Sequence, residues 1–162
     1  ESSIAAVDIK KGIDSTLIIL NHRLKSGIKL IKEYNSVPLI QCYPAQLNQV
    51  FMNIISNAID AIEETQNSAS WNSEEIPTIW IITEVDGDYL KVRIKDNGPG
   101  IAPEIREKIF ESFFTTKSVG KGTGLGLAIS YQIVAKHNGT IEVNSEPGKG
   151  TEFAIALPVE SV

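Results

Sequence analysis

With 162 residues, a formal net charge of −5 and 42% hydrophobic residues, the chain has the length and composition of one globular domain with a sizeable core. The acidic balance argues against duplex nucleic acid and anionic membranes as partners, and no apolar run approaches the length of a membrane span. The single cysteine, Cys42, has no partner for an internal disulfide and no metal-ligand spacing, so we expect a small buried hydrophobic residue.

The first predicted elements are a helix and a short strand. Apolar residues recur at helical spacing from Ile9 to Leu24, and Asp8 can cap the start, which predicts a helix over residues 8–26. Residues 28–34 alternate between apolar and polar side chains, as a half-buried strand does.

Stronger elements follow, separated by two segments without clear periodicity. Residues 64–77 are polar and irregular, and residues 97–122 are rich in glycine. The predicted elements are a helix that begins at Pro44 and ends near Ile62, strands at 78–85 and 89–95 joined by a turn at Asp86 and Gly87, a helix at 123–137, and a hairpin with strands at 140–145 and 151–157. Helices mixed with antiparallel hairpins predict an α+β layer sandwich rather than a succession of βαβ units.

The helix that begins at Pro44 carries a polar stripe made mostly of amides. At 100° per residue, six residues fall within an arc of about 100°, namely Gln46, Gln49, Asn53, Ser56, Asn57 and Asp60. One interpretation is a weakly polar surface helix. The other is a helix that lines a cleft, since Asn53 and Asn57 point the same way and amide oxygens can bind a hard cation such as Mg²⁺ that also holds phosphate oxygens.

Two glycine-rich stretches suggest places where the backbone approaches a ligand. In "DNGPGI", Asp96 ends a predicted strand directly before Gly98 and Gly100, a pattern that is also typical of an ordinary turn. In "GKGTGLGLA", residues 120–128, alternate glycines precede a predicted helix, where backbone N–H groups favour an anion. The second stretch matches neither a Walker A loop nor a Rossmann fingerprint.

Five motifs in order carry a resemblance to a known family: "NQVFMNIISNAIDAI", "DNGPGI", "FESFFTTK", "GTGLGLAIS" and "GKGTEF". They resemble the N, G1, F, G2 and G3 boxes of the ATP-binding catalytic domain of bacterial sensor histidine kinases, whose superfamily includes gyrase, the large heat-shock chaperone and mismatch-repair ATPases. The resemblance implies a single domain over residues 1–162 with the Bergerat ATP-binding fold. This fold is a two-layer α/β sandwich with a mixed, mostly antiparallel sheet packed on helices, and it carries an ATP lid at about 97–122.

The resemblance also implies roles for individual residues. Asp96 would accept a hydrogen bond from the adenine amino group, and Asn57 would bind Mg²⁺ with help from Asn53. Lys117 and Lys121 in the lid are either phosphate contacts or solvated charges. The remaining implied contacts are Gly98 and Gly100 beside the base, Ala61 and Ile101 against the ring, Gly122, Thr123, Gly124, Leu125, Gly126 and Leu127 around the phosphates, and Thr151 through water.

Two departures from the superfamily pattern refine the expected function. ATP-hydrolysing relatives, like the related serine kinases, have a glutamate where this chain has Asn53, and an amide cannot act as a general base. We therefore expect phosphoryl transfer to a protein, with a serine kinase or an ATPase of the superfamily as an alternative and a non-catalytic nucleotide-binding or docking module as another. His22 and His137 lack the acidic neighbour that follows the phosphorylated histidine of these kinases.

The expected partner is thus the histidine-bearing dimerisation domain of the parent kinase, with a response regulator acting indirectly and no self-phosphorylation by this chain. The chain begins at Glu1 without a methionine or a signal peptide, which suggests a piece of a longer protein. We expect this piece to be a monomer in the cytoplasm without direct membrane contact, whether the parent is soluble or membrane-anchored.

Overall fold

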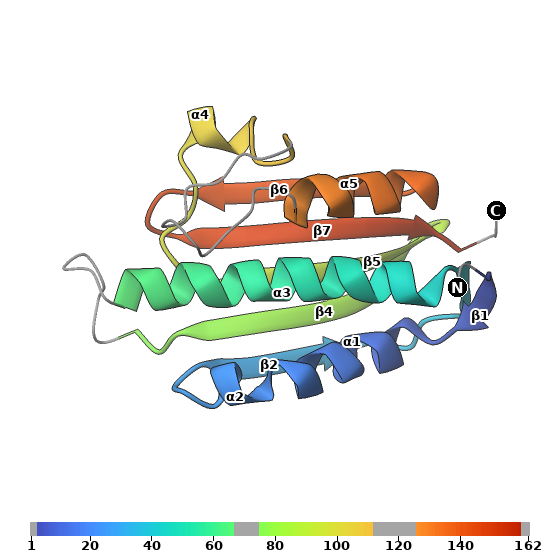
Figure 1. The fold of residues 1–162 in the computed structure, drawn as a ribbon, viewed down its shortest axis with the longest axis horizontal. Coiled ribbons are helices and arrows are strands. Elements are labelled where there is room, and N and C mark those ends of the chain that lie inside the picture. The colour runs from blue at the N-terminus through green and yellow to red at the C-terminus, as the bar shows by residue number, and fades with distance from the viewer. Residues whose placement is uncertain (1–2, 67–74, 112–125, 160–162) are drawn as a thin grey trace.

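In the computed structural model, residues 3–66, 75–111 and 126–159 are described. Figure 1 shows α1, α3 and α5 lying side by side over one face of a sheet, with a small strand pair at one end. The elements are β1 (Ala5–Val7), α1 (Ile9–Ile19), α2 (Asn21–Leu24), β2 (Lys29–Tyr34), β3 (Ile40–Cys42), α3 (Pro44–Gln66), β4 (Thr78–Asp86), β5 (Tyr89–Asp96), α4 (Pro103–Arg106), α5 (Gly126–Lys136), β6 (Thr140–Glu146) and β7 (Gly150–Pro158).

The main sheet has the strand order β2-β4-β5-β7-β6. β2 pairs in parallel with β4, and the other neighbours are antiparallel, so the predicted mixed and mostly antiparallel sheet under a helical layer is confirmed. Within this sheet Asp96 of β5 lies opposite Thr151 of β7, and Thr151 lies opposite Ser145 of β6. The register therefore places three polar residues in one row across three strands.

The core lies between the sheet and the helices, because each element buries one apolar face. In β5, Leu90, Val92 and Ile94 alternate with more exposed residues and point to the helices, which follows from the two-residue period of a strand. Phe51 and Ile59 are among the α3 residues that fill the space above them. Asp96 continues the inward alternation of β5, so a carboxylate enters the buried layer at the strand end.

Most predicted elements are confirmed, with differences at their ends. The helix expected over 8–26 is divided at Leu20, and the irregular segment expected over 64–77 is wrong at its start because α3 continues to Gln66. Apolar contacts of Ile62 and the buried Thr65 extend that helix beyond its polar stripe. The sheet formed by β1 and β3 was not predicted, because three-residue strands carry almost no periodic signal.

Four other expectations concern the burial of Cys42, the start of α3, the segment at 97–122 and membrane-spanning helices. Cys42 is buried, as expected for a hydrophobic side chain, and Pro44 is the first residue of α3. Part of the segment at 97–122 is the short helix α4, whereas its residues from 112 onward lie outside the described ranges. Within the part of the chain that the structure describes, none of the helices has the length and apolar character needed to cross a bilayer.

Candidate functional site

The candidate site is built around the carboxylate of Asp96, which is only 4% exposed. Its Oδ1 accepts a hydrogen bond from the N–H of Gly98 at 2.8 Å, and the backbone N–H of Thr151, on the paired strand β7, also stabilises the ionised carboxylate. The first contact joins Asp96 to the loop that follows β5, and the second joins it to β7. A carboxylate held from both sides in this way presents its remaining lone pairs in a fixed direction.

Burial and hydrogen bonding act in opposite directions on the pKa of Asp96. Burial raises the pKa from its ordinary value of 3.8 to about 6, because the ionised form loses hydration, while the N–H groups of Gly98 and Thr151 lower it. The net upward shift means that ionised Asp96 is less stable in the fold than in water. A ligand that donates a hydrogen bond to this carboxylate would stabilise the ionised form.

We expect this shift to appear in the pH dependence of folding. Since the folded-state pKa lies above the unfolded value, the contribution of Asp96 to stability is present below about pH 4 and is lost as the pH rises through about 6. The free energy of unfolding of the wild type, minus that of the non-titrating variant Asp96→Asn, should fall by on the order of 2–3 kcal/mol between about pH 4 and pH 7. Urea denaturation at several pH values measures it, and a constant or rising difference would contradict the assignment.

Gly98 brings the loop after β5 against α3. A Cβ atom at this position would lie 3.0 Å from Oδ1 of Asp96, which is a tight contact, and 3.6 Å from the Cβ of Ala61, which is an ordinary van der Waals contact. The structure thus brings together three of the predicted site residues, Asp96, Gly98 and Ala61. Ile101 belongs to the same loop, is half-buried and packs against the core.

A second glycine joins this loop to the turn between β6 and β7. Gly100 has φ +77°, and a Cβ atom there would overlap the carbonyl oxygen of Glu146. The N–H of Gly148 also donates to the carbonyl oxygen of Pro99 at 2.6 Å. Two segments that lie nearly fifty residues apart in the sequence therefore form one backbone surface beside Asp96.

The two asparagines of α3 differ in their contacts. The Nδ2 of Asn53 donates to the carbonyl oxygen of Gly126 at 3.0 Å and to Oγ of Ser130 at 3.1 Å, which ties α3 to the first turn of α5. The side chain of Asn57 is half-buried and has no hydrogen-bond partner among the residues that the structure describes. Asn57 therefore offers an uncommitted amide, whereas Asn53 offers only its Oδ1, which has a weak contact with Gln49 at 3.5 Å.

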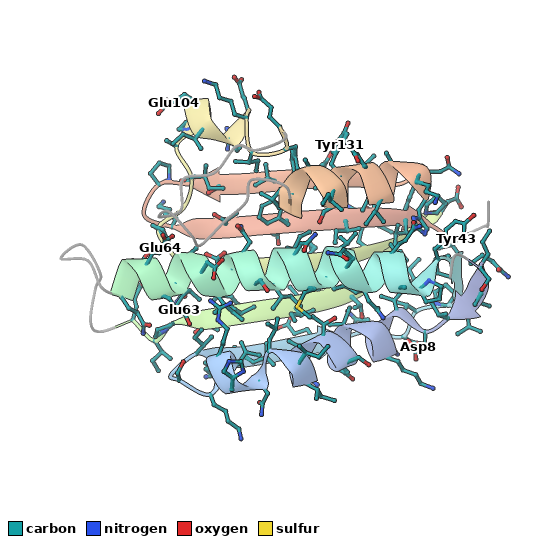
Figure 2. The ribbon with its side chains drawn as sticks, in the orientation of Figure 1. Asp8, Tyr43, Glu63, Glu64, Glu104 and Tyr131 are labelled. Carbon is teal, nitrogen blue, oxygen red and sulfur yellow. The ribbon has the colours of Figure 1, made fainter. Side chains whose placement is uncertain are left out.

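The polar stripe of α3 does not act as one surface. Asp60 forms an ion pair with Arg23 of α2 at 2.5 Å, and the same guanidinium contacts Glu63 at 2.7 Å. Figure 2 shows Glu63 on the side of α3 that faces α2. Asp60 thus faces α2 while Asn53 faces α5, and the interpretation of all six residues as one cleft lining is wrong for Asp60.

Two of the predicted phosphate contacts lie at the start of α5, and other predicted site residues lie outside the described ranges. Leu127 lies in the first turn of α5, packed against the core, and Gly126 lies beside Asn53. The residues outside the described ranges are Lys117, Lys121, Gly122, Thr123, Gly124 and Leu125. Sequence reasoning did not single out Ser145, which contacts both Ile101 and Thr151; its place directly before "EPGKG" was the available signal.

A hollow elsewhere on the molecule does not involve the predicted site residues, and the described residues contain no cluster typical of a metal site. A hollow of about 630 Å³ lies between α1, α2 and β2, and none of the predicted site residues lines it. Among the described residues, no group of three or more histidine, cysteine or carboxylate side chains could hold a metal ion. A metal here would therefore depend on amide oxygens together with oxygens of a bound ligand.

Comparison with known proteins relates the chain to one family. Residues 42–161 match the family described as histidine kinase-, DNA gyrase B- and HSP90-like ATPase. Sporulation kinase E of Bacillus subtilis (strain 168) is 41% identical over 126 residues, which are 77% of this chain and 15% of that protein. The sensor histidine kinase ZraS of Escherichia coli (strain K12) is 36% identical over 159 residues, which are 97% of this chain and 31% of that protein.

The solved structure of full-length ShkA in complex with AMPPNP has a TM-score of 0.81 and 29% sequence identity to this chain. The match covers 100% of this chain and 32% of ShkA. The chain thus spans less than a third of the length of each of these three proteins.

Proposed function

This chain belongs to the family of histidine kinase-, DNA gyrase B- and HSP90-like ATPases, and we propose that it is the Mg²⁺-ATP-binding catalytic domain of a two-component sensor histidine kinase. In this proposal the domain donates the γ-phosphoryl group of ATP to a histidine on a separate dimerisation domain. Residues 1–162 form one domain, with 97–122 as its ATP lid. The observation that carries the proposal is the buried Asp96 carboxylate, which is bonded to the N–H of Gly98 and lies opposite Thr151 and beside Ala61.

Asp96 is the anchor for the base in this proposal. Adenine carries an amino group where guanine and hypoxanthine carry a carbonyl, so a fixed acceptor favours adenine. Ala61 and Ile101 are apolar and could pack against the ring. Thr151 lies directly opposite Asp96 on β7 and belongs to the same end of the site.

The described residues fit a magnesium ion that is shared with nucleotide phosphates. Mg²⁺ uses few protein ligands when phosphates supply the others, and the uncommitted amide of Asn57 is a suitable one. Such an ion would neutralise charge on the phosphates during phosphoryl transfer. We propose Asn57 as the principal ligand, and Asn53 as a residue that can add only Oδ1 because its Nδ2 is bonded to α5.

The contacts of the two histidines favour an acceptor outside this chain. His137 is 4% exposed; its Nε2 accepts from the N–H of Tyr43 at 3.1 Å, and its Nδ1 lies 2.8 Å from the carbonyl oxygen of Ile133. Figure 2 shows Tyr43 next to the first turn of α3, so His137 joins that turn to the end of α5. His22 is exposed but lacks an acidic neighbour in the sequence. We therefore propose the parent's dimerisation domain as partner, a response regulator as indirect partner, and a monomeric, cytoplasmic fragment.

The direct test is phosphoryl transfer between separated parts. The chain alone, incubated with γ-labelled ATP and Mg²⁺, is expected to remain unlabelled, whereas addition of the parent's histidine-bearing domain should place acid-labile label on that domain. Label on His22 or His137 would contradict the proposal. Nucleotide binding without transfer would favour a non-catalytic module, and rapid phosphate release would favour an ATPase.

Substitution of the two asparagines should separate their roles. Asn57→Ala is expected to remove most of the Mg²⁺-dependent part of ATP binding while leaving the free energy of unfolding nearly unchanged, since its side chain has no partner among the described residues. Asn53→Ala breaks two hydrogen bonds to α5 and should lower the free energy of unfolding by about 1–2 kcal/mol. Calorimetric titration with and without Mg²⁺, together with urea denaturation, measures both. Equal stability losses in the two variants would contradict this division.

A further inference from the structure

Three polar side chains form a row that the proposed function does not fully use. Asp96, Thr151 and Ser145 lie directly opposite one another on β5, β7 and β6, which are neighbours in Figure 1. Residues paired in this way share a face of the sheet, and Asp96 points to the helical layer. Their exposed fractions are 4%, 7% and 9%, so each polar group depends on partners inside the protein.

The Oγ atom of Ser145 has three such partners. The N–H of Ile101 donates to it at 2.7 Å, the carbonyl oxygen of Gly150 lies at 3.0 Å, and Oγ1 of Thr151 lies at 2.9 Å. Its backbone is also held, because Nη1 of Arg106 donates to the Ser145 carbonyl oxygen at 2.9 Å. Ser145 thus joins the loop after β5 to the start of β7.

Only one arrangement of protons satisfies all three contacts. A carbonyl oxygen can only accept, so the Ser145 hydroxyl proton must go to Gly150. The contact with Ile101 uses the amide proton of Ile101. The third contact then requires the hydroxyl proton of Thr151, so Thr151 donates to Ser145.

This arrangement determines what Thr151 can offer to a ligand. With its proton directed to Ser145, Oγ1 of Thr151 retains only lone pairs, and the neighbouring Asp96 carboxylate is also an acceptor when ionised. The backbone N–H of Thr151 already acts on that carboxylate and lowers its pKa. The side chains of Asp96 and Thr151 therefore present acceptors alone, and a base or an ordered water beside them must supply the donors.

We propose that Ser145 is a positioning residue that sets the donor and acceptor pattern of the base site and thereby favours a base with an exocyclic amino group over one with a carbonyl. This inference rests on the proposed function, since it requires a purine nucleotide whose base lies against Asp96. Ser145 acts through Thr151 and through the amide of Ile101 and need not touch the nucleotide. Without Ser145, the Thr151 hydroxyl is free to rotate and donate to a carbonyl.

The test compares ADP with IDP, which differ only in the amino or carbonyl group at position 6 and the associated proton on the ring. Both are titrated calorimetrically without divalent metal into the wild type, Ser145→Ala and Ser145→Thr. The wild type should prefer ADP, and Ser145→Ala should reduce the ratio of the two affinities by about fivefold to tenfold, the effect of one hydrogen bond. Ser145→Thr, which restores a hydroxyl, should recover most of the ratio.

A control variant separates this role from a general loss of stability. Thr83→Val removes another buried hydroxyl from the same sheet, one that bonds only Asn35 among the described residues, and should leave the affinity ratio unchanged. If Ser145→Ala weakens both nucleotides equally, or changes neither, the inference is wrong.

If Ser145→Ala does not fold, Thr151→Val tests the inference instead, because it removes the hydroxyl that Ser145 orients. A reduced preference for ADP in Thr151→Val supports the inference, and an unchanged one refutes it. A wild type that binds neither nucleotide overturns the proposed function and this inference together. A wild type that prefers ADP, with the same preference in Ser145→Ala, refutes the inference alone.

Discussion

Replacement of Asp96 by alanine is expected to lower the affinity for ADP by about 100-fold, since a hydrogen bond to a charged group contributes about 1.5–3 kcal/mol and the loop beside the base also loses its anchor. That anchor is the contact from the N–H of Gly98 to Oδ1 at 2.8 Å. Calorimetric titration of ADP without metal measures the change independently of any effect on Mg²⁺ binding.

The variant Asp96→Asn is the matched control, because it keeps the shape of the side chain and an acceptor for Gly98. Its amide NH₂ group would face the amino group of adenine, so it should weaken ADP while strengthening IDP. A folded Asp96→Ala variant that binds ADP within about threefold of the wild type would show that the carboxylate does not contact the base. The proposed orientation of the nucleotide would then be wrong.

Replacement of Gly150 by alanine is expected to lower the free energy of unfolding by about 3 kcal/mol or more. Gly150 has φ +99°, in the region that favours glycine, and a Cβ atom there would overlap the carbonyl oxygen of Asp96. That oxygen belongs to the β5 backbone and cannot move without disturbing the pairing of Asp96 with Thr151. The substitution should therefore reduce both stability and nucleotide affinity.

Gly148 provides the matched control in the same turn. It has φ +82°, but among the described residues, apart from its two chain neighbours, no heavy atom lies within 4 Å of the position that a Cβ atom would occupy. Gly148→Ala should thus lower the free energy of unfolding only by the cost of the left-handed conformation for alanine, about 1 kcal/mol. Urea denaturation of both variants separates conformational preference from steric overlap, and equal losses at the two positions would contradict the close approach of Gly150 to β5.

The sequence by itself determined the local elements and the family. The strands from Thr78 and from Tyr89 and the long helix from Pro44 follow from apolar periodicity, which depends only on neighbouring residues. The order of five short motifs identified an ATP-binding domain of the histidine kinase type. The structure brings Asp96, Gly98 and Ala61 together, whereas their roles toward a nucleotide and the metal role of Asn57 stay predictions.

The tertiary structure decided which of these residues act on one another. Asp60 belonged to the polar stripe by helical angle, but its pairing with Arg23 depends on where α2 packs. Likewise, Asp96, Thr151 and Ser145 come from three strands, and only the register of β5, β7 and β6 places them in one row. Periodicity describes which face of an element a residue occupies, whereas strand register and helix packing are set by long-range burial, and these determine the hydrogen-bond partners at the site.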